Sequence, residues 1–511
     1  MGKVFIETVG CPKNQEDSER MAGLLVGAGH EIVFDPAESD FIIVNTCGFI
    51  EAAKRESIDT FFSYLPYREE GRKIIMTGCL TQRYPEELAA ELPEADAIFG
   101  VNDYDKLPGV VSALERGGSS RRPGPALRTT DEYGAMALPA GRRVFAGSSE
   151  TGAAAEPRFA LSPRHTSYLK IAEGCSNRCA YCAIPDIRGP YRSLPMEELE
   201  EEAGRLAAEG CRELILIAQD LTWYGKDLYG GFTLQELLRR LCASEAVKGV
   251  EWIRLLYCYA ERVTDELIEA MASEPRILKY IDLPLQHIND RILRSMRRAG
   301  TGPGIRDTIG RLRKAMPGIV IRTTFITGLP GESEEDFCEL YDFVEETRFD
   351  RLGVFAYSPE EGTDAASMPG QVDADVAEAR RDELMRLQQR ISLENNRKLV
   401  GSVLDVFVDG RDEGGEDGSV GGSSAEAGEC CKGSDRDRLG AEDGLYIGRT
   451  RGDAPDIDNA VLFEAPGVDG IIGTIVKVRI TDALDYDLVG ELESGAQSGT
   501  VERPVLHEST E

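Results

Sequence analysis

Two long stretches of this chain alternate short apolar runs with helical segments, and this alternation constrains the fold more than any other feature. In the first stretch the expected strands cover residues 3–9, 30–35, 41–46, 73–78 and 97–101. Strands that alternate with helices form parallel sheets, because each helix carries the chain back across the sheet. We therefore predict an N-terminal domain over 1–118 with a doubly wound parallel sheet. A helix is expected to start near Asn14, with Asn14 as its cap, and to run to about Gly29.

The same alternation returns over residues 161–392. The six expected strands lie in TSYLKIA, RELILIA, VEWIRLLY, LKYIDLP, IVIRTTFITG and DRLGVFAYS. Six strand–helix units are too few for the closed eight-fold barrel, so we predict a partial (β/α)6 barrel. A long helix over 373–400 leads out of it. The intervening residues 119–160 are rich in Gly, Ser, Ala, Arg and Pro, which bury little apolar surface, and are predicted to form a flexible linker.

The pattern changes again towards the C-terminus, where short strands follow one another without helices. These strands, separated by turn residues, predict a small all-β barrel over about 395–495. Within it, residues 410–441 are dominated by Gly, Ser and acidic residues, which predicts a disordered insertion. Residues 496–511 are expected to form a tail. The whole chain of 511 residues accommodates three domains of roughly 100 to 200 residues each.

The net charge of −32, from 58 basic and 90 acidic residues, bears on which partner the chain can bind. Nucleic-acid binding depends on Lys and Arg that neutralise phosphates, so no strong RNA binding is expected. From Arg397 to Glu511 there are 11 basic and 25 acidic residues, a local net charge of −14. A basic protein partner suits this charge. The alternative, that the acidity only aids solubility, stays open.

The longest apolar runs, such as 41–44 and 214–218, are far shorter than the ~18 residues that a membrane span needs. The chain begins without a secretory signal pattern, and we expect a cytoplasmic protein with no membrane partner. The cytoplasm keeps thiols reduced, so the 12 cysteines are better suited to metal or redox chemistry than to disulfides.

Three of these cysteines stand close together in EGCSNRCAYCAIP, residues 173–185. Cys175, Cys179 and Cys182, here called the contiguous trio, have the spacing C-x3-C-x2-C and follow an expected barrel strand. Iron–sulfur clusters usually take four thiolates, so three would leave one iron of a four-iron cluster open. A structural zinc ion would need a fourth Cys or His, and the residues that follow offer none. The spacing favours an iron–sulfur cluster over zinc and over buried structural thiols.

A second set is dispersed along the N-terminal domain. Cys11, Cys47 and Cys79, here called the dispersed trio, each follow an expected parallel strand. The carboxyl ends of such strands meet at one edge of the sheet, where ligands bind. Adjacent helix N-termini are expected to favour thiolates. One such cysteine alone would be taken as a core or loop residue, but the three together predict a second cluster.

The strand before the contiguous trio, its spacing and Tyr181 before its last cysteine make residues 161–392 resemble the radical S-adenosylmethionine enzymes. The resemblance implies that the open iron binds S-adenosylmethionine, which is cleaved on reduction to a 5′-deoxyadenosyl radical. The family's glycine-rich methionine-binding element is not recognisable in LIAQDLTWYG, residues 216–225. No side chain is therefore assigned to that task.

Two three-cysteine sites followed by a β-barrel resemble the methylthiotransferases of this superfamily over nearly the whole chain. The resemblance implies two 4Fe–4S clusters and a TRAM-like barrel. The cluster on the contiguous trio would generate the radical, and the cluster on the dispersed trio would carry the sulfur. S-adenosylmethionine would serve as radical source and as methyl donor, with an external electron donor.

Members of this family act on adenosines of transfer RNA or on the β-carbon of an aspartate in ribosomal protein S-twelve. Four stretches are similar to the second group: VGCPKNQEDSE (9–19), IDLPLQHINDRILRSMRR (281–298), RTTFITGLPGESEEDF (322–337) and YSPEEGT (357–363). This similarity implies that the partner is the basic ribosomal protein, free or in the small subunit. A transfer-RNA methylthiotransferase and a non-catalytic iron–sulfur or zinc scaffold are kept as alternatives.

The remaining cysteines receive no functional role. Cys430 and Cys431 are expected to be incidental exposed thiols in the insertion, without a counterpart in the family. Four others are predicted core residues, namely Cys211, Cys242, Cys258 and Cys338. His287 stands at the end of a barrel strand, where it could face the active site or make a structural polar contact.

Overall fold

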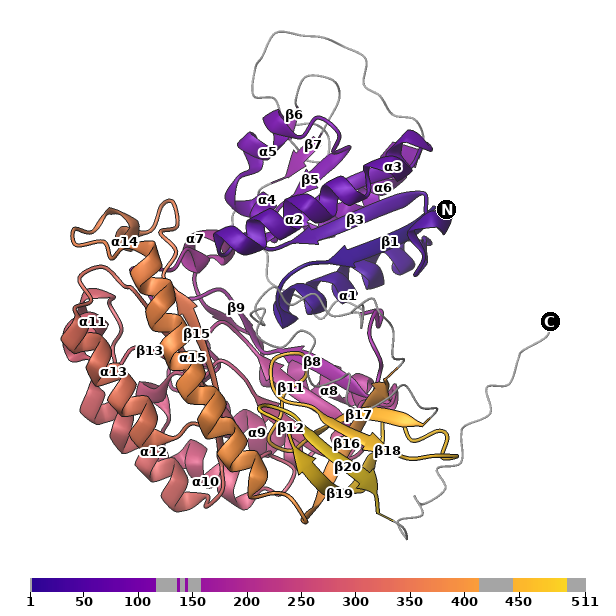
Figure 1. Ribbon diagram of the computed structural model, residues 1–511. Helices are drawn as coiled ribbons and strands as arrows, with labels where there is room; N and C mark the ends of the chain where they lie inside the picture. Colours follow the sequence, from indigo (N-terminus) through magenta and orange to yellow (C-terminus); the bar gives the residue numbers. More distant parts are fainter. Residues whose placement is uncertain (1, 116–135, 138–142, 146–157, 413–443, 494–511) are drawn as a thin grey trace. The chain divides into compact units, whose positions relative to one another are not determined.

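The computed structural model describes residues 2–115, 136–137, 143–145, 158–412 and 444–493 (Figure 1). The chain divides into two compact units. The first contains the described residues up to Gln388, and the second contains those from Gln389 onward. None of the described helices combines the length and the apolar composition that crossing a membrane requires.

The N-terminal part of the first unit is built on a seven-stranded sheet with the order β2-β1-β3-β4-β5-β7-β6. Its first five strands are parallel and confirm the predicted strands: β1 (Lys3–Thr8), β2 (Glu31–Ile32), β3 (Phe41–Thr46), β4 (Lys73–Gly78) and β5 (Ala97–Phe99). β3 is buried along its whole length, as expected for a strand covered on both faces. The covering helices are α1 (Pro12–Gly27), α2 (Glu51–Ser63), α3 (Leu65–Glu69), α4 (Cys79–Arg83), α5 (Pro85–Glu91) and α6 (Leu107–Glu115).

Five residues of segment 119–160 differ from the linker prediction. β7 (Arg143–Phe145) pairs in parallel with β5, and β6 (Met136–Ala137) pairs antiparallel with β7. Both strands extend the sheet at its edge. The strand Arg-Val-Phe contains a β-branched and an aromatic residue, which suit a sheet. It was missed because the composition was averaged over some forty residues, in which three residues have little weight.

The second part of the first unit contains the six parallel strands predicted for a partial barrel. They form two three-stranded sheets, β12-β11-β8 and β13-β14-β15, with a bridge between Ile253 and Ile277 beside them. The strands are β8 (Thr166–Lys170), β11 (Glu213–Ile217), β12 (Trp252–Leu255), β13 (Tyr280–Gln286), β14 (Val320–Thr327) and β15 (Arg351–Ala356). A two-stranded hairpin of β9 (Ala172–Glu173) and β10 (Arg192–Ser193) follows β8.

Helices separate these strands, as expected for alternating strand–helix units. They are α7 (Ile184–Arg188), α8 (Met196–Ala208), α9 (Leu234–Ala243), α10 (Asp265–Ser273), α11 (Asp290–Ser295), α12 (Gly302–Ala315), α13 (Glu334–Thr347) and α14 (Asp364–Ser367). The predicted long exit helix is α15 (Ala374–Arg397).

The second unit contains a closed five-stranded barrel, as predicted, with the order β16-β17-β18-β20-β19. Its strands are β16 (Val403–Arg411), β17 (Leu445–Thr450), β18 (Val461–Glu464), β19 (Ile475–Ala483) and β20 (Leu488–Leu492). The side chains of Tyr446 and Phe463 stack in its core with ring centroids 5.8 Å apart. Most of the predicted insertion, with Cys430 and Cys431, lies outside the described residues, as does the predicted tail.

Candidate functional site

The contiguous trio lies in the loop that follows β8 and β9. Cys175 and Cys179 are buried and Cys182 is half-buried. The N–H of Cys175 donates to the carbonyl oxygen of Gly189 at 3.0 Å, and the N–H of Cys182 donates to that of Cys179 at 3.1 Å. These backbone hydrogen bonds help to fix the path of the loop that carries the three cysteines.

A glycine precedes this trio for a steric reason. Gly174 has a φ of +80°, and a Cβ atom added there would lie 2.2 Å from the carbonyl oxygen of Pro190. Only glycine allows the two strands of the loop to approach this closely. The position of Cys175 therefore depends on its neighbour as well as on its own contacts.

Charged side chains that sequence analysis missed lie beside the contiguous trio. Asp220, just after β11, accepts hydrogen bonds from Asn177 Nδ2 at 2.9 Å and Arg262 Nη1 at 2.6 Å. Arg262 Nη2 also donates to Asn177 Oδ1 at 2.8 Å, and Asn177 belongs to the trio loop. Burial raises the pKa of Asp220, against the opposing effect of Arg262. The only sequence signal was a polar residue at the end of a buried strand.

A second cation lies close to the same loop. The guanidinium of Arg298 stands 4.1 Å from the ring centroid of Tyr259. Burial raises the pKa of Tyr259 well above its usual range, with Arg298 opposing and Cys179 adding to the effect. Arg298, which follows α11, and Arg262, in the segment after β12, thus place positive charge near the contiguous trio.

The dispersed trio converges at the carboxyl edge of the N-terminal sheet, as predicted. The Oδ1 atom of Asn14 lies 3.8 Å from Cys11 Sγ and 3.9 Å from Cys79 Sγ. A Cβ atom on Gly10 would lie 2.9 Å from Cys47 Cβ. The three cysteines gather because β1, β3 and β4 are neighbouring parallel strands whose ends lie side by side. Their role as cluster ligands stays a prediction.

The beginning of α1 differs from the expectation. The helix starts at Pro12 with Cys11 at the cap position, and Asn14 does not cap it. Instead, Asn14 Nδ2 donates to the carbonyl oxygens of Val9 at 2.9 Å and Thr46 at 3.1 Å. The cap prediction was wrong because the helix begins before Asn14, at Pro12, whose ring favours the first helical position. The amide of Asn14 contacts two strand ends that the sequence does not show to be adjacent.

The expected preference for thiolates at helix N-termini does not prevail at Cys79. Burial raises the pKa of this thiol, and Arg188 is the largest opposing influence. Burial also raises the pKa of Cys175 in the other trio, to about 11. Cys79 and Cys175 are therefore buried thiols whose protons leave most readily when a metal takes their place.

The donor chemistry of both trios fits an iron–sulfur cluster. Each offers three sulfur atoms, one fewer than the four thiolates of a fully protein-bound cluster. No three His, Cys, Asp or Glu side chains of the described ranges surround a single metal position. A four-iron cluster takes each thiolate on a different iron atom, so it does not require such a group.

Other candidate residues have structural surroundings. His287 is fully buried, its Nδ1 accepts from the N–H of Asn289 at 3.0 Å, and its Nε2 lies 3.6 Å from a carboxylate oxygen of Glu332. These contacts favour the structural interpretation of His287. Cys211 and Cys258 are buried as predicted and Cys242 is half-buried. The prediction for Cys338 was wrong: it is exposed, on the outer face of α13.

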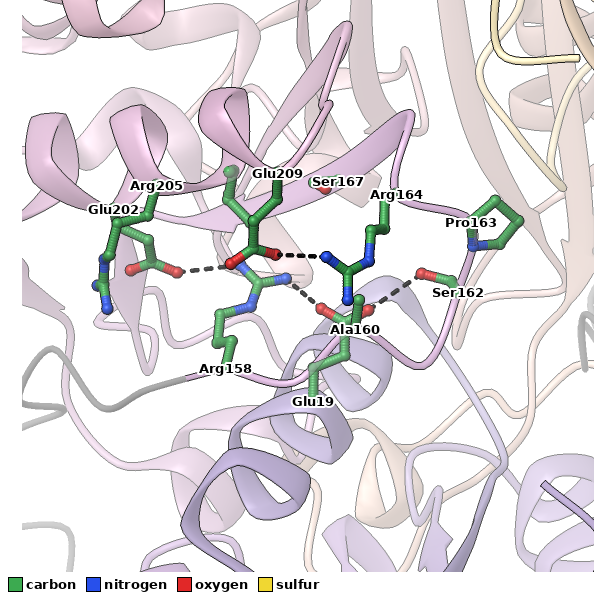
Figure 2. Close-up of a pocket in the computed structure, with 11 residues that line it drawn as sticks. Glu19, Arg158, Ala160, Ser162, Pro163, Arg164, Ser167, Glu202, Arg205 and Glu209 are labelled. Atoms are coloured by element: carbon green, nitrogen blue, oxygen red, sulfur yellow. Dashed lines mark hydrogen bonds and ion pairs between the residues drawn. The ribbon is translucent and has the colours of Figure 1, made fainter. Parts of the chain in front are cut away.

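A cavity of about 150 Å³, drawn in Figure 2, has no cysteine of either trio among its lining residues. It is lined by residues of α1, of α8 and of the segment that leads into β8, whereas the contiguous trio follows the other end of β8. Arg158 donates to Glu19 and Glu202, and Arg164 lies 3.9 Å from Glu209. Its charged groups pair with one another, and no function is assigned to the cavity.

Comparisons with known proteins agree with the division of the chain. The radical SAM superfamily matches residues 169–344, the uncharacterized protein family UPF0004 matches 3–100, and the TRAM domain matches 435–492. The fold resembles a radical S-adenosylmethionine methyltransferase, TsrM, from Kitasatospora setae, with a TM-score of 0.52 and 14% identity over 79% of this chain and 80% of that one. The chain is thus a radical S-adenosylmethionine protein.

Curated relatives are similar over nearly their full lengths. Ribosomal protein uS12 methylthiotransferase RimO of Desulforamulus reducens is 46% identical over 96% of this chain and 100% of its own. The protein of the same name from Anaeromyxobacter sp. (strain Fw109-5) is 45% identical over 96% of this chain and 93% of its own. The protein of that name from Geobacter sulfurreducens is 44% identical over 96% of this chain and 99% of its own. This chain belongs to the ribosomal protein uS12 methylthiotransferase family.

Proposed function

We propose that this protein attaches a methylthio group to ribosomal protein uS12. The observation that carries the proposal is the near full-length similarity to relatives of that name, at 44–46% identity. The three-part architecture and the two three-cysteine sites support it independently. The protein is an enzyme, a radical S-adenosylmethionine methylthiotransferase.

The proposed target atom is the β-carbon of an aspartate, as the resemblance to this branch of the family implies. Two four-iron clusters and S-adenosylmethionine would supply the radical, the sulfur and the methyl group. An unactivated C–H bond suits radical chemistry, because a side-chain base of ordinary strength cannot remove its proton at a useful rate. An external electron donor, not identified by the sequence, is part of the proposal.

The chain's own contribution is to bind, orient and shield. We assign the contiguous trio and the dispersed trio as the two ligand sets. Arg262 and Asp220 present opposite charges beside the contiguous trio, which suits a zwitterionic amino-acid group such as that of S-adenosylmethionine. The burial of Cys175 and Cys179 in one trio and of Cys79 in the other would help to keep water away from reactive intermediates.

The acidic C-terminal segment supports a basic protein as partner. Among its described residues from Arg397 onward, 7 basic and 13 acidic side chains give a net charge of −6, out of −14 for the whole segment. A phosphate backbone would be repelled by such a surface, and strong RNA binding is not proposed. The proposed substrate also implies a cytoplasmic location, where ribosomal subunits are found.

The deciding experiment is mass spectrometry of uS12 from cells that lack the gene. The mass of one methylthio group in place of hydrogen should be missing from uS12, and should return with the intact gene. Complementation with Cys47→Ser should fail, whereas complementation with Cys338→Ser, an exposed cysteine, should succeed. Unchanged modification of uS12 in the deletion strain, with methylthio-adenosine lost from its transfer RNA instead, would favour the transfer-RNA alternative.

Anaerobic reconstitution tests the cofactors separately. The intact chain should bind roughly eight irons, as two four-iron clusters require, and should cleave S-adenosylmethionine on reduction. Bound zinc without cleavage would contradict the enzyme and support a scaffold.

A further inference from the structure

One short helix joins the two cysteine sites. α7 begins two residues after Cys182 and packs against α4, which begins at Cys79. Ala183 and Ile187 form a buried cluster with Cys79. The segment that completes the contiguous trio thus continues directly to the dispersed trio, within the same compact unit.

The last residue of α7, Arg188, is almost fully buried, with 1% of its surface exposed. Its Nη1 donates to both carboxylate oxygens of Glu173, at 3.0 and 3.1 Å. Its Nη2 donates to Asp17 Oδ2 at 2.9 Å and to Asn14 Oδ1 at 3.1 Å. Four hydrogen bonds therefore hold the guanidinium between the barrel strand region and α1, which fixes its plane as well as its position.

The side-chain orientation of Asn14 follows from its other partners. Its Nδ2 donates to two backbone carbonyl oxygens, which can only accept, so Oδ1 must be the atom that faces Arg188. The same Oδ1 lies within 3.9 Å of the sulfur atoms of Cys11 and Cys79. Arg188 therefore contacts the amide oxygen that lies beside two thiols of the dispersed trio, and it also interacts directly with Cys79.

The electrostatics of this arrangement favour negative charge on the sulfur atoms. An amide oxygen beside two thiolates is repulsive, because both partners are acceptors, and the cation Arg188 next to it offsets that repulsion. Lys170 binds Asp17 at 2.5 Å, Glu16 at 2.8 Å and Glu173 at 3.0 Å, so the buried charges around Arg188 include three carboxylates and this second cation. Arg188 is the member of the group that contacts Asn14.

We propose that Arg188 is a positioning residue for a cluster on the dispersed trio. Its charge stabilises the reduced, more negative state of that cluster and the thiolates that hold it, so its removal lowers the reduction potential and weakens iron retention. Through Glu173 and α7, Arg188 also links the surroundings of this cluster to the loop of the contiguous trio. The inference rests on the second cluster that forms part of the proposed function.

The test compares the full chain with Arg188→Gln and Arg188→Lys in a background in which all three cysteines of the contiguous trio are replaced by alanine. Only the second cluster then contributes to the spectrum. Redox titration followed by electron paramagnetic resonance should show a more negative potential for Arg188→Gln and a potential near the parent's for Arg188→Lys. Iron should pass to a chelator several-fold faster from Arg188→Gln. A parent-like potential and iron retention in Arg188→Gln would overturn the inference.

Two further variants separate charge from folding. Arg188→Gln combined with Glu173→Gln removes one charge of each sign, and the negative shift should persist. Arg254→Gln is the matched control, because Arg254 pairs with Glu213 at 2.7 Å and both are fully buried on strands of the barrel. It should lower stability without shifting the potential. An equal shift in this control would overturn the inference. A parent that binds no second cluster would refute the proposed cofactor and, with it, the role of Arg188.

Discussion

The contiguous trio and the dispersed trio offer the same ligands but are assembled by different means. The contiguous trio occupies one loop and spans only eight positions, although Ala180 in that loop also makes backbone hydrogen bonds to Met296 and Ala365. The dispersed trio needs three strand ends, from cysteines 36 and 32 positions apart, and forms only once the sheet has formed. The comparison teaches that three cysteines far apart in sequence can still form one site. The condition is that each follows a parallel strand, so that the sheet brings the three strand ends together.

The largest effect is expected from loss of a contiguous-trio cysteine. Cys179→Ala should remove one cluster, so that iron falls from roughly eight to roughly four per chain, and should abolish cleavage of S-adenosylmethionine. Iron analysis and assay of 5′-deoxyadenosine check this result. Cys338→Ala, on the exposed face of α13, is the control and should change neither quantity. Residual cleavage at the parent's rate would mean that the two trios have been assigned the wrong roles.

Loss of a dispersed-trio cysteine should distinguish the functions of the two sites. Cys47→Ala should also retain roughly four irons, but it should continue to cleave S-adenosylmethionine while forming no methylthiolated product. Product analysis by mass spectrometry, alongside the cleavage assay, distinguishes this variant from Cys179→Ala. If cleavage were lost as well, the two sites could not be treated as independent.

The next largest effect is expected from Gly78, which precedes Cys79 of the dispersed trio. Gly78 has a φ of +107°, and a Cβ atom there would lie 2.3 Å from the carbonyl oxygen of Thr46. Gly78→Ala should therefore lower the free energy of unfolding by on the order of 3 kcal/mol and displace Cys79. Urea denaturation and iron analysis measure the two effects.

Gly71→Ala is the matched control for Gly78. Gly71 also has a positive φ, +99°, but its Cβ atom would meet nothing within 4 Å. It should cost only about 1 kcal/mol of backbone strain, with iron binding intact. Equal losses at both positions would show that the close approach beside Cys79 has no energetic importance.

The smallest expected effect concerns the side chain that supports Cys47. Ser57 Oγ, fully buried, accepts from the N–H of Cys47 at 2.9 Å and donates to its carbonyl oxygen at 3.1 Å. Ser57→Ala should lower the free energy of unfolding by about 1–2 kcal/mol, because the N–H of Cys47 loses its partner. Ser63→Ala, which removes an exposed hydrogen bond from the end of the same helix, should change it by less than about 0.5 kcal/mol. Thermal unfolding of the two variants measures whether Ser57→Ala lowers the free energy of unfolding more than Ser63→Ala does.

The strands of the fold could be predicted because their signals are local. Runs such as FIIVNT and KIIMTG are buried on both faces, and the parallel arrangement follows from the helices between them. Two short strands of the N-terminal sheet were missed, since three residues of suitable composition are no signal within a Gly- and Ser-rich segment. The exposed position of Cys338 was missed because its sequence does not tell which face of α13 it occupies.

At the candidate site, cysteines could be predicted and their surroundings could not. Spacing identifies the contiguous trio, and position after a strand identifies the dispersed trio. Asp220, Arg262 and Asn177 lie tens of residues apart and carry no shared pattern, so only the fold brings them together. Asn14 was predicted as a helix cap, whereas its amide serves two strand ends.

By itself the sequence determined the three-part architecture, because periodicity acts through short-range geometry, and it predicted two sets of three cysteines from their spacing and their places after strands. Only the tertiary structure decided which charges surround those sulfur atoms. Arg188 reaches Asp17 and Asn14 across more than 170 positions of sequence, and a buried charge is stable only where folding supplies its partners.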